Sequence, residues 1–264
     1  MSRTFARTLS IAVIMIVVWA PAARGSVIDD LSDLNDTANP IWTHLDGLVA
    51  STGQTWDAST GQYRMTAPNN GFSNLGFVGS YVDTAFSDVV VSVDIMSFIG
   101  AGAPFGVAAR LDENDAFNQL QGYGLAYEPY AAAGLGEVVL YRIDGANFAD
   151  LGHQQVTLDP LRDYRLVLEV AGNQLHGQVF DIAAGTMVAE RFANDATYAS
   201  GFAGLFAYSQ IPIPPADVTW DNFEARDTAA VPEPGTALLV GIGAAAMAVR
   251  RTRRRVLNCK TRPT

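Results

Sequence analysis

The chain has 264 residues, of which 49% are hydrophobic, and its formal net charge is −10. Residues 26–231 carry 26 acidic side chains against seven arginines and no lysine, a formal charge of −19, which repels polyphosphate and disfavours nucleic-acid binding. The single cysteine, Cys259, lies beyond those residues, so disulfides, thiol catalysis and cysteine-based zinc sites are excluded from them.

The first 25 residues have the pattern of a secretory signal peptide. Arg3 and Arg7 form a basic region, an apolar run of twelve residues extends from Leu9 to Ala20, and small residues then offer a cleavage site. A transmembrane helix is the alternative, but such a helix needs about 20 apolar residues. We therefore predict that residues 1–25 are a signal peptide and that the chain is exported.

The segment after the signal peptide has a weak helical pattern. Ile28, Leu31 and Leu34 are apolar and spaced as on one face of a helix. This spacing predicts one or two helical turns.

Strand patterns dominate the chain from residue 61 to residue 225. Apolar and polar side chains alternate at 88–96 and 164–170, which is the period of a strand with one face in a core. Asp144-Gly145, Ala171-Gly172-Asn173 and Ala184-Gly185 are turn sequences that predict hairpins. Strands are predicted at 61–67, 88–96, 105–111, 122–128, 137–143, 164–170, 174–181, 186–192, 203–209 and 217–225. We expect an all-β fold in which residues 26–227 form one antiparallel β-sandwich of the jelly-roll kind.

Three features follow one another at the C-terminus. A linker at 228–234 ends in Pro232, Glu233 and Pro234, an apolar run occupies 235–249, and a basic tail occupies 250–264. The tail begins with five arginines: Arg250, Arg251, Arg253, Arg254 and Arg255. The glycine spacing at 241–246 matches a dinucleotide-binding loop, but the surrounding sequence lacks the strands that such a loop requires. As a helix, the apolar run is about 22 Å long, which makes a short transmembrane span. The arginines that follow it are expected to remain in the cytoplasm.

This order of features resembles the PEP-CTERM sorting signal of Gram-negative bacteria. The resemblance rests on Val231-Pro232-Glu233-Pro234-Gly235, the small-residue apolar run and the arginine cluster. It implies that an exosortase, a multi-pass membrane protease, processes the tail. The protein would be anchored transiently in the inner membrane on its way to the cell envelope or extracellular matrix. Residues 256–264 extend beyond the usual end of such signals, and a plain tail anchor is the alternative.

The strand region resembles concanavalin A-like or laminin-G-like jelly rolls. The likeness is carried by the Gly-Asn-x-Leu-x-Gly hairpin at 172–177, the stretch at 201–204 and the closing Trp220-Asp221-Asn222-Phe223. Members of this superfamily bind glycans, act as adhesive modules or hydrolyse polysaccharides. Function must therefore be inferred from the site.

The sequence offers little support for catalysis. Laminarinase-type relatives place their carboxylates in Glu-x-Asp-x-x-Glu on one strand, and that triplet is absent here, where Asp94 and Glu169 are single acids on predicted strands. His44, His153 and His176 lack metal-ligand spacing. We expect a non-enzymatic glycan-binding or adhesive protein, with a secreted polysaccharide hydrolase or lyase as the alternative.

Calcium is the one ion that the composition favours, and no cofactor is required. Asp112, Asn114 and Asp115 lie in one polar loop, and Asp221 lies beside the closing strand, where superfamily relatives often hold a structural calcium. Polar residues of this kind also make ordinary turns, which is the alternative interpretation.

Tyrosines are the candidates for sugar contacts. Tyr123, Tyr127 and Tyr130 cluster near two glutamines, and aromatic faces stack on sugar rings while amides bind hydroxyls. Tyr123 and Tyr127 share one strand face. That face is either a glycan platform or part of the core.

Overall fold

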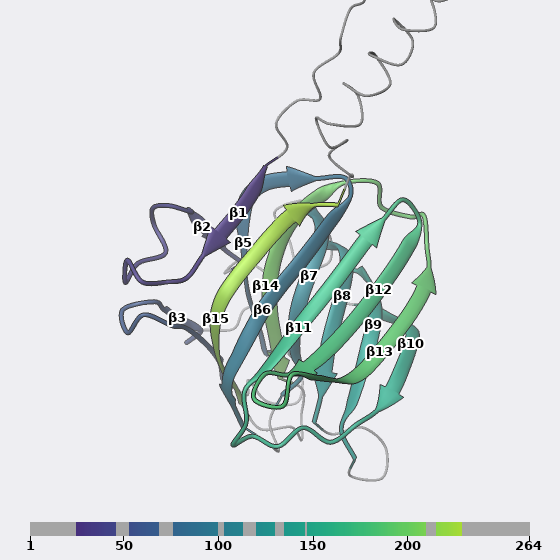
Figure 1. The fold of residues 1–264 in the computed structure, drawn as a ribbon. Coiled ribbons are helices and arrows are strands. Elements are labelled where there is room, and N and C mark those ends of the chain that lie inside the picture. The colour runs from purple at the N-terminus through teal and green to yellow at the C-terminus, as the bar shows by residue number, and fades with distance from the viewer. Residues whose placement is uncertain are drawn as a thin grey trace, which may run out of the picture.

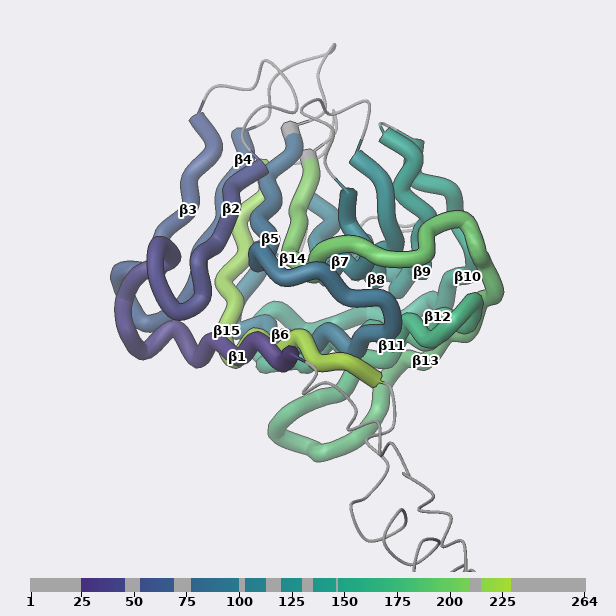
Figure 2. The backbone as a smooth tube through the Cα atoms, turned by 90° about the horizontal axis from the view of Figure 1, so that it is seen from above, coloured from purple at the N-terminus to yellow at the C-terminus, as the bar shows by residue number. Residues whose placement is uncertain are grey.

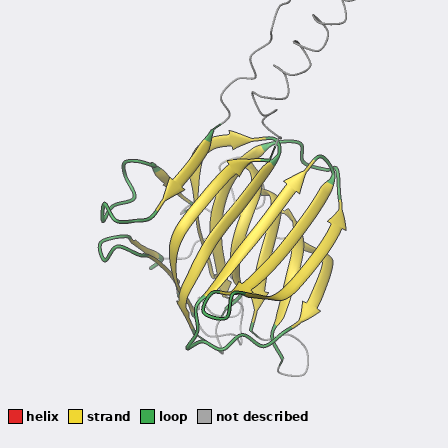
Figure 3. Ribbon diagram, viewed as in Figure 1, coloured by secondary structure: helices red, strands yellow, loops and turns green. Residues whose placement is uncertain are grey.

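The computed structural model describes residues 25–45, 53–68, 76–99, 103–112, 120–129, 135–145, 147–209 and 215–228. Within those ranges the chain forms fifteen strands and no helix (Figure 3). None of the described residues belongs to a helix that is long and apolar enough to cross a membrane. The predicted sorting helix and basic tail, and all of the predicted signal peptide except its last residue, lie outside these ranges.

The strands form two antiparallel sheets that pack face to face (Figures 1 and 2). The eight-stranded sheet follows the order β13 (Thr186–Asn194), β12 (Gln174–Asp181), β11 (Tyr164–Ala171), β6 (Val89–Phe98), β15 (Ala216–Asp227), β4 (Tyr63–Ala67) and β3 (Thr55–Asp57), with β1 (Ser26–Asp29) also paired to β15. The seven-stranded sheet follows the order β10 (Asn147–Gln155), β9 (Glu137–Asp144), β8 (Gln121–Glu128), β7 (Phe105–Asp112), β14 (Gly201–Ser209), β5 (Gly76–Phe86) and β2 (Trp42–His44). The predicted all-β sandwich is confirmed.

The main core lies between the two sheets. In β6 the side chains of Val89, Val91, Val93 and Ile95 are completely buried, and Val90 and Ser92 between them are half-buried on the opposite face. The same alternation runs along β11. Because each buried aliphatic side chain contributes roughly 1.5–3 kcal/mol, the period-two pattern sets which face of each strand turns inward.

The three predicted hairpins are confirmed. Antiparallel pairing joins β9 to β10, β11 to β12 and β12 to β13. Gly172 has a φ of 58° and Gly185 a φ of 63°, a left-handed conformation that glycine adopts without steric cost.

The predicted helix at residues 28–34 is wrong. β1 ends at Asp29, and the following residues form turns in which Leu31 and Leu34 have positive φ angles of 55° and 62°. The carboxylates of Asp29 and Asp33 accept hydrogen bonds from backbone amides two residues later, at 2.8 and 3.2 Å. Such local side-chain acceptors compete with the helical hydrogen-bond pattern.

Candidate functional site

A pocket of about 330 Å³ lies on the outer face of the eight-stranded sheet, across β11, β12 and β13. We call it the Phe192 pocket, and its lining includes Glu169, Gln174, His176, Phe192 and Asn194. Glu169 pairs in register with His176, and His176 pairs with Phe192, so the three side chains form one row across the strands. Their neighbours along the chain face the core, which leaves this row pointing outward.

The ring of Phe192 is the central apolar element of the pocket. It is 66% exposed, and it stacks on the ring of His176 with centroids 4.1 Å apart and planes 10° from parallel. Nε2 of His176 lies 2.9 Å from Oε1 of Glu190. The histidine is therefore fixed from one side by an acid and from the other by the phenyl ring, which orients an aromatic surface toward solvent.

Of the polar side chains in the row, Glu169 makes the fewest polar contacts. Its Oε2 lies 3.9 Å from Nδ1 of His176, and in the described part of the chain it makes no closer polar contact. Gln174 and Asn194 are directly opposite in register and present exposed amides together on one side of the row. An exposed ring with amide and carboxylate groups around it is the combination that recognises a polyol ring.

β13 lies at the edge of its sheet, but strand β10 of the other sheet holds it in place (Figure 1). Nε of Arg191 donates to the carbonyl oxygen of His153 at 2.5 Å, and the amide of Glu190 donates to Oε1 of Gln154 at 3.2 Å. These bonds connect the two sheets next to the Phe192 pocket. Phe192 therefore lies on a strand that these bonds hold in place, and not on a loop.

A second group of polar side chains lies on the outer face of the seven-stranded sheet. Glu128 of β8 and Glu137 of β9 are directly opposite in register, a position in which Cβ atoms are typically about 5 Å apart. The hydroxyls of Tyr141 and Tyr208 both donate to Oε1 of Glu128, the second at 2.8 Å. Burial, and then the charge of Glu128, raise the pKa of Glu137. One acid of the pair is thus held as a hydrogen-bond acceptor and the other is shifted toward its protonated form.

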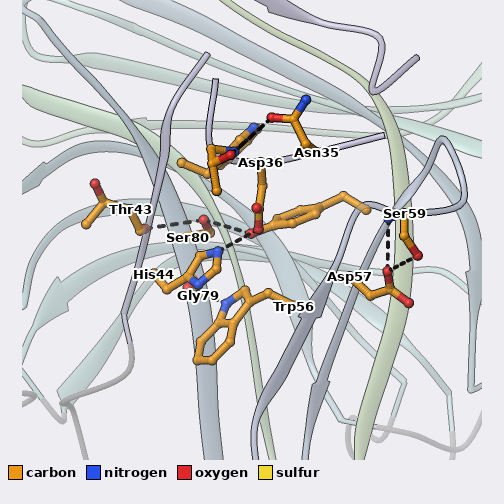
Figure 4. A network of polar contacts seen from close by, with 12 residues as sticks. Asn35, Asp36, Thr43, His44, Trp56, Asp57, Ser59, Gly79 and Ser80 are labelled. Carbon is orange, nitrogen blue, oxygen red and sulfur yellow. Dashed lines mark hydrogen bonds and ion pairs between the residues drawn. The ribbon is translucent and has the colours of Figure 1, made fainter. Parts of the chain in front are cut away.

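A third polar group joins the two sheets at β2, β3 and β5 (Figure 4). His44 lies 2.8 Å from the carboxylate of Asp36 and stacks on Trp56 at a centroid distance of 4.6 Å. The indole nitrogen of Trp56 donates to the carbonyl oxygen of Gly79 in the opposite sheet at 2.9 Å. In Figure 4 these side chains point toward one another, and the bonds connect the sheets. This group is a structural clamp.

The structure places two of the predicted sugar-contacting tyrosines in the core. Tyr123 is 0% exposed and Tyr127 is 2% exposed. The hydroxyl of Tyr123 donates to Asp195, and the hydroxyl of Tyr127 accepts a bond from the amide of Leu158. Neither ring can reach a sugar, so the core interpretation of this face applies to both. Tyr130 lies outside the described residues.

The two single strand acids have different environments. Asp94 is 4% exposed and accepts two bonds from Arg165, at 2.6 and 2.8 Å, so it is a buried structural acid. Glu169 belongs to the Phe192 pocket.

The described residues do not assemble a calcium site. Asp112 is exposed at the end of β7 in one sheet, whereas Asp221 lies on β15 in the other and accepts the amide of Asn222 at 2.7 Å. In the described ranges no three histidine, cysteine, aspartate or glutamate side chains gather as metal ligands. Asn114 and Asp115 lie outside those ranges, so a calcium loop there stays a prediction.

Each of the three histidines is paired with a carboxylate. His44 pairs with Asp36, His176 with Glu190, and His153 with Asp150 at 2.7 Å. The hydrogen bond to Asp150 raises the pKa of His153.

Sequence reasoning missed Phe192, although a signal for it was present. In the segment Thr186–Asn194, Glu190, Phe192 and Asn194 share one parity, which places a large aromatic side chain on a polar strand face. It also missed Glu128 and Glu137, because the Glu-x-Asp-x-x-Glu motif lies on one strand, whereas this pair of acids spans two.

Residues 230–255 match the family described as the PEP-CTERM protein-sorting motif. The chain carries a PEP-CTERM sorting motif. This motif marks an exported protein with a membrane-anchoring signal at its C-terminus. A search of curated protein sequences found no relative of the chain.

Solved structures share the fold of the PEP-CTERM protein's β-sandwich. The Ca²⁺-bound exoplasmic/lumenal domain of VIP36 has a TM-score of 0.54 at 9% identity, covering 78% of this chain and 90% of that one. The CBM2 module of the evolved Dit of Lactobacillus casei BL23 phage J-1 has a TM-score of 0.53 at 12% identity, covering 77% and 96%. A Bacillus subtilis protein with a galectin-like fold has a TM-score of 0.53 at 12% identity, covering 76% and 94%. The described part of the chain therefore shares the jelly-roll β-sandwich fold of these structures.

Proposed function

We propose that this chain is a non-enzymatic protein of the cell envelope or extracellular matrix that binds glycans at the Phe192 pocket. The observation that carries the proposal is an exposed phenyl ring, braced by His176 and flanked by amides, on a lectin-like sandwich. VIP36 is bound to Ca²⁺ and Man2 in one solved structure and to Ca²⁺ and Man3GlcNAc in another, which supports glycans as the class of ligand.

The sorting motif supports the location. We propose a signal peptide at 1–25, a sandwich at 26–227, a Pro-Glu-Pro linker at 228–234, a transmembrane sorting helix at 235–249 and a cytoplasmic tail at 250–264. In this scheme an exosortase of a Gram-negative bacterium recognises Pro232, Glu233 and Pro234 while the helix holds the protein in the inner membrane. The sandwich is then released to the envelope or matrix.

Replacing the exposed ring tests the binding site. We expect Phe192→Ala to weaken binding on a glycan array at least tenfold, because stacking and burial of a phenyl ring contribute about 1.5 kcal/mol or more. Met187→Ala is the matched control, since Met187 is an exposed apolar residue of the same strand at 45% exposure. Equal binding by wild type and Phe192→Ala would reject this site.

A polysaccharide hydrolase or lyase is the second candidate function, and the Glu128–Glu137 pair favours it. Hydrolysis needs two carboxyl groups roughly 5–9 Å apart, one protonated and one ionised. The cross-strand register and the raised pKa of Glu137 fit an acid at Glu137 and a base at Glu128.

Release of reducing ends decides between the two functions. If the pair is catalytic, wild-type protein produces reducing ends from a panel of polysaccharides and Glu137→Gln lowers the rate at least a hundredfold, the usual size of a general-acid effect. Glu224→Gln, a change at a half-exposed acid of β15, leaves the rate unchanged. Retention of glycans without any product supports the binding protein instead.

A further inference from the structure

The charges around the Phe192 pocket have one sign. Its carboxylates are Glu169, with 43% side-chain exposure, and the neighbouring Glu190, with 37%. Among its lining residues, all of them described, there is no arginine or lysine, and the one group that can become cationic is His176. Because His176 lies between the two acids, the site stays negative whether or not the imidazole is protonated.

The rest of the sandwich is also negatively charged. Residues 26–231 have a formal charge of −19. Arg165 lies on the same row of the sheet as Asp94, and its guanidinium already donates two hydrogen bonds to the Asp94 carboxylate. A sugar with a carboxylate or sulfate group would therefore meet repulsion at the pocket and no compensating cation in its lining.

We infer that the Phe192 pocket selects glycans with free amino groups, that is, protonated hexosamines, over neutral and acidic glycans. The inference rests on the proposed glycan-binding function. The phenyl ring takes the apolar face of the sugar, the amides of Gln174 and Asn194 take hydroxyls, and Glu169, which has no close partner of its own, pairs with the ammonium group.

The test compares three hexasaccharides by calorimetry at a pH of about 5.5, where sugar amines are protonated and glutamates stay ionised. The probes are the hexamers of glucosamine, N-acetylglucosamine and galacturonate. We expect the glucosamine hexamer to bind about fivefold tighter than the acetylated one, the size of a solvent-exposed ion pair, with the preference shrinking as salt is added. The galacturonate hexamer binds weakest.

Two variants separate a specific contact from general attraction. Glu169→Gln abolishes the preference for the amine, because the neutral amide cannot form an ion pair with the ammonium group. Glu224→Gln is the matched control, because Glu224 is a similarly exposed acid of the same sheet, 3.8 Å from its arginine partner. An equal effect of both variants would overturn the inference.

Different binding results would contradict the inference alone and the proposed function as a whole. If the acetylated hexamer binds as tightly as the amine and Phe192→Ala weakens both, the pocket binds glycans without charge selection, and the inference is wrong. If none of the hexamers nor any glycan on the array is bound, the proposed function is wrong as well.

Discussion

At the scale of single residues, burial determines what each ion pair contributes. Arg165 and Asp94 form two hydrogen bonds, and so do Arg64 and Asp217. The side chain of Asp94 is 5% exposed, whereas that of Asp217 is 29% exposed. The buried acid also accepts a bond from Asn222 at 3.0 Å. The same geometry thus stabilises the fold at Asp94 and contributes little at Asp217.

Alanine at these two positions measures the difference. We expect Asp94→Ala to lower the free energy of unfolding by about 1–3 kcal/mol, because the hydrogen bonds from Arg165 and Asn222 to a buried carboxylate are lost, although both donors are exposed and can still reach water. Asp217→Ala should cost less than about 1 kcal/mol, as exposed pairs do. Urea unfolding of both variants gives the two values. Equal losses would contradict the assignment of Asp94 as a buried structural acid.

At the scale of elements, one buried arginine joins two turns and the segment that precedes a third strand. Arg110 of β7 has a φ of 52° and is 2% exposed. Its guanidinium donates to the carbonyl oxygens of Ser87, Gly172 and Tyr198 at 2.5, 2.9 and 2.7 Å. These carbonyls belong to the β5–β6 turn, the β11–β12 turn and the segment before β14. Backbone strain at Arg110 is therefore offset by bonds that tie this end of the sandwich together.

Asp195 is the acid of a second network at that end. It accepts bonds from the hydroxyl of Tyr123 and from Arg142, at 2.8 and 3.0 Å. Burial alone would raise the pKa of Asp195, but hydrogen bonds from Thr197, Tyr123 and Arg142 outweigh it and lower the pKa to about 2.

This lowered pKa predicts a pH dependence of stability. Because the folded-state pKa lies below the unfolded value of 3.8, the stabilisation is present above pH 3.8 and is lost as the pH falls toward about 2. We expect Asp195→Asn to cost roughly 2 kcal/mol at neutral pH and almost nothing near pH 2. Urea unfolding of both proteins across this range measures the difference. A difference that does not change with pH would contradict the prediction.

At the scale of the whole molecule, charge separates the sandwich from the tail. Residues 26–231 hold 26 of the 27 acidic residues, and five arginines cluster after the apolar run. The sorting motif spans the boundary between the two, at residues 230–255. This distribution supports the proposal that the arginines lie on the cytoplasmic side of the membrane, where basic residues next to an apolar span are favoured.

Mass spectrometry of the secreted protein tests processing of this tail. In a strain that has an exosortase, we expect the released protein to end near Pro232–Gly235, because the protease removes the apolar run and the arginines. Replacing Pro232, Glu233 and Pro234 with alanine should keep the full chain in the membrane fraction. A released protein that still ends at Thr264 would contradict processing.

The sequence predicted strands with one covered face and also strands buried on both faces, such as β7 and β8. β6, β11 and β12 alternate between buried and half-buried residues, so their local pattern was sufficient. β5 was missed, and its residues 77–80, which are buried on both faces, show no alternation. β10 was also missed, and every residue in it is half-buried or exposed at the edge of its sheet.

The sequence by itself determined the all-β class, the hairpins and the sorting motif, because each depends on neighbouring residues: period-two alternation, turn chemistry and a contiguous signal. Only the tertiary structure decided which aromatic residues are available to a ligand. Alternation shows that Tyr123 and Phe192 each lie on one of two strand faces, but it cannot show which face the other sheet covers. Tyr123 is buried in the core, whereas Phe192 is exposed to solvent. The same holds for Glu128 and Glu137, nine residues apart in sequence, which antiparallel pairing brings to opposite positions.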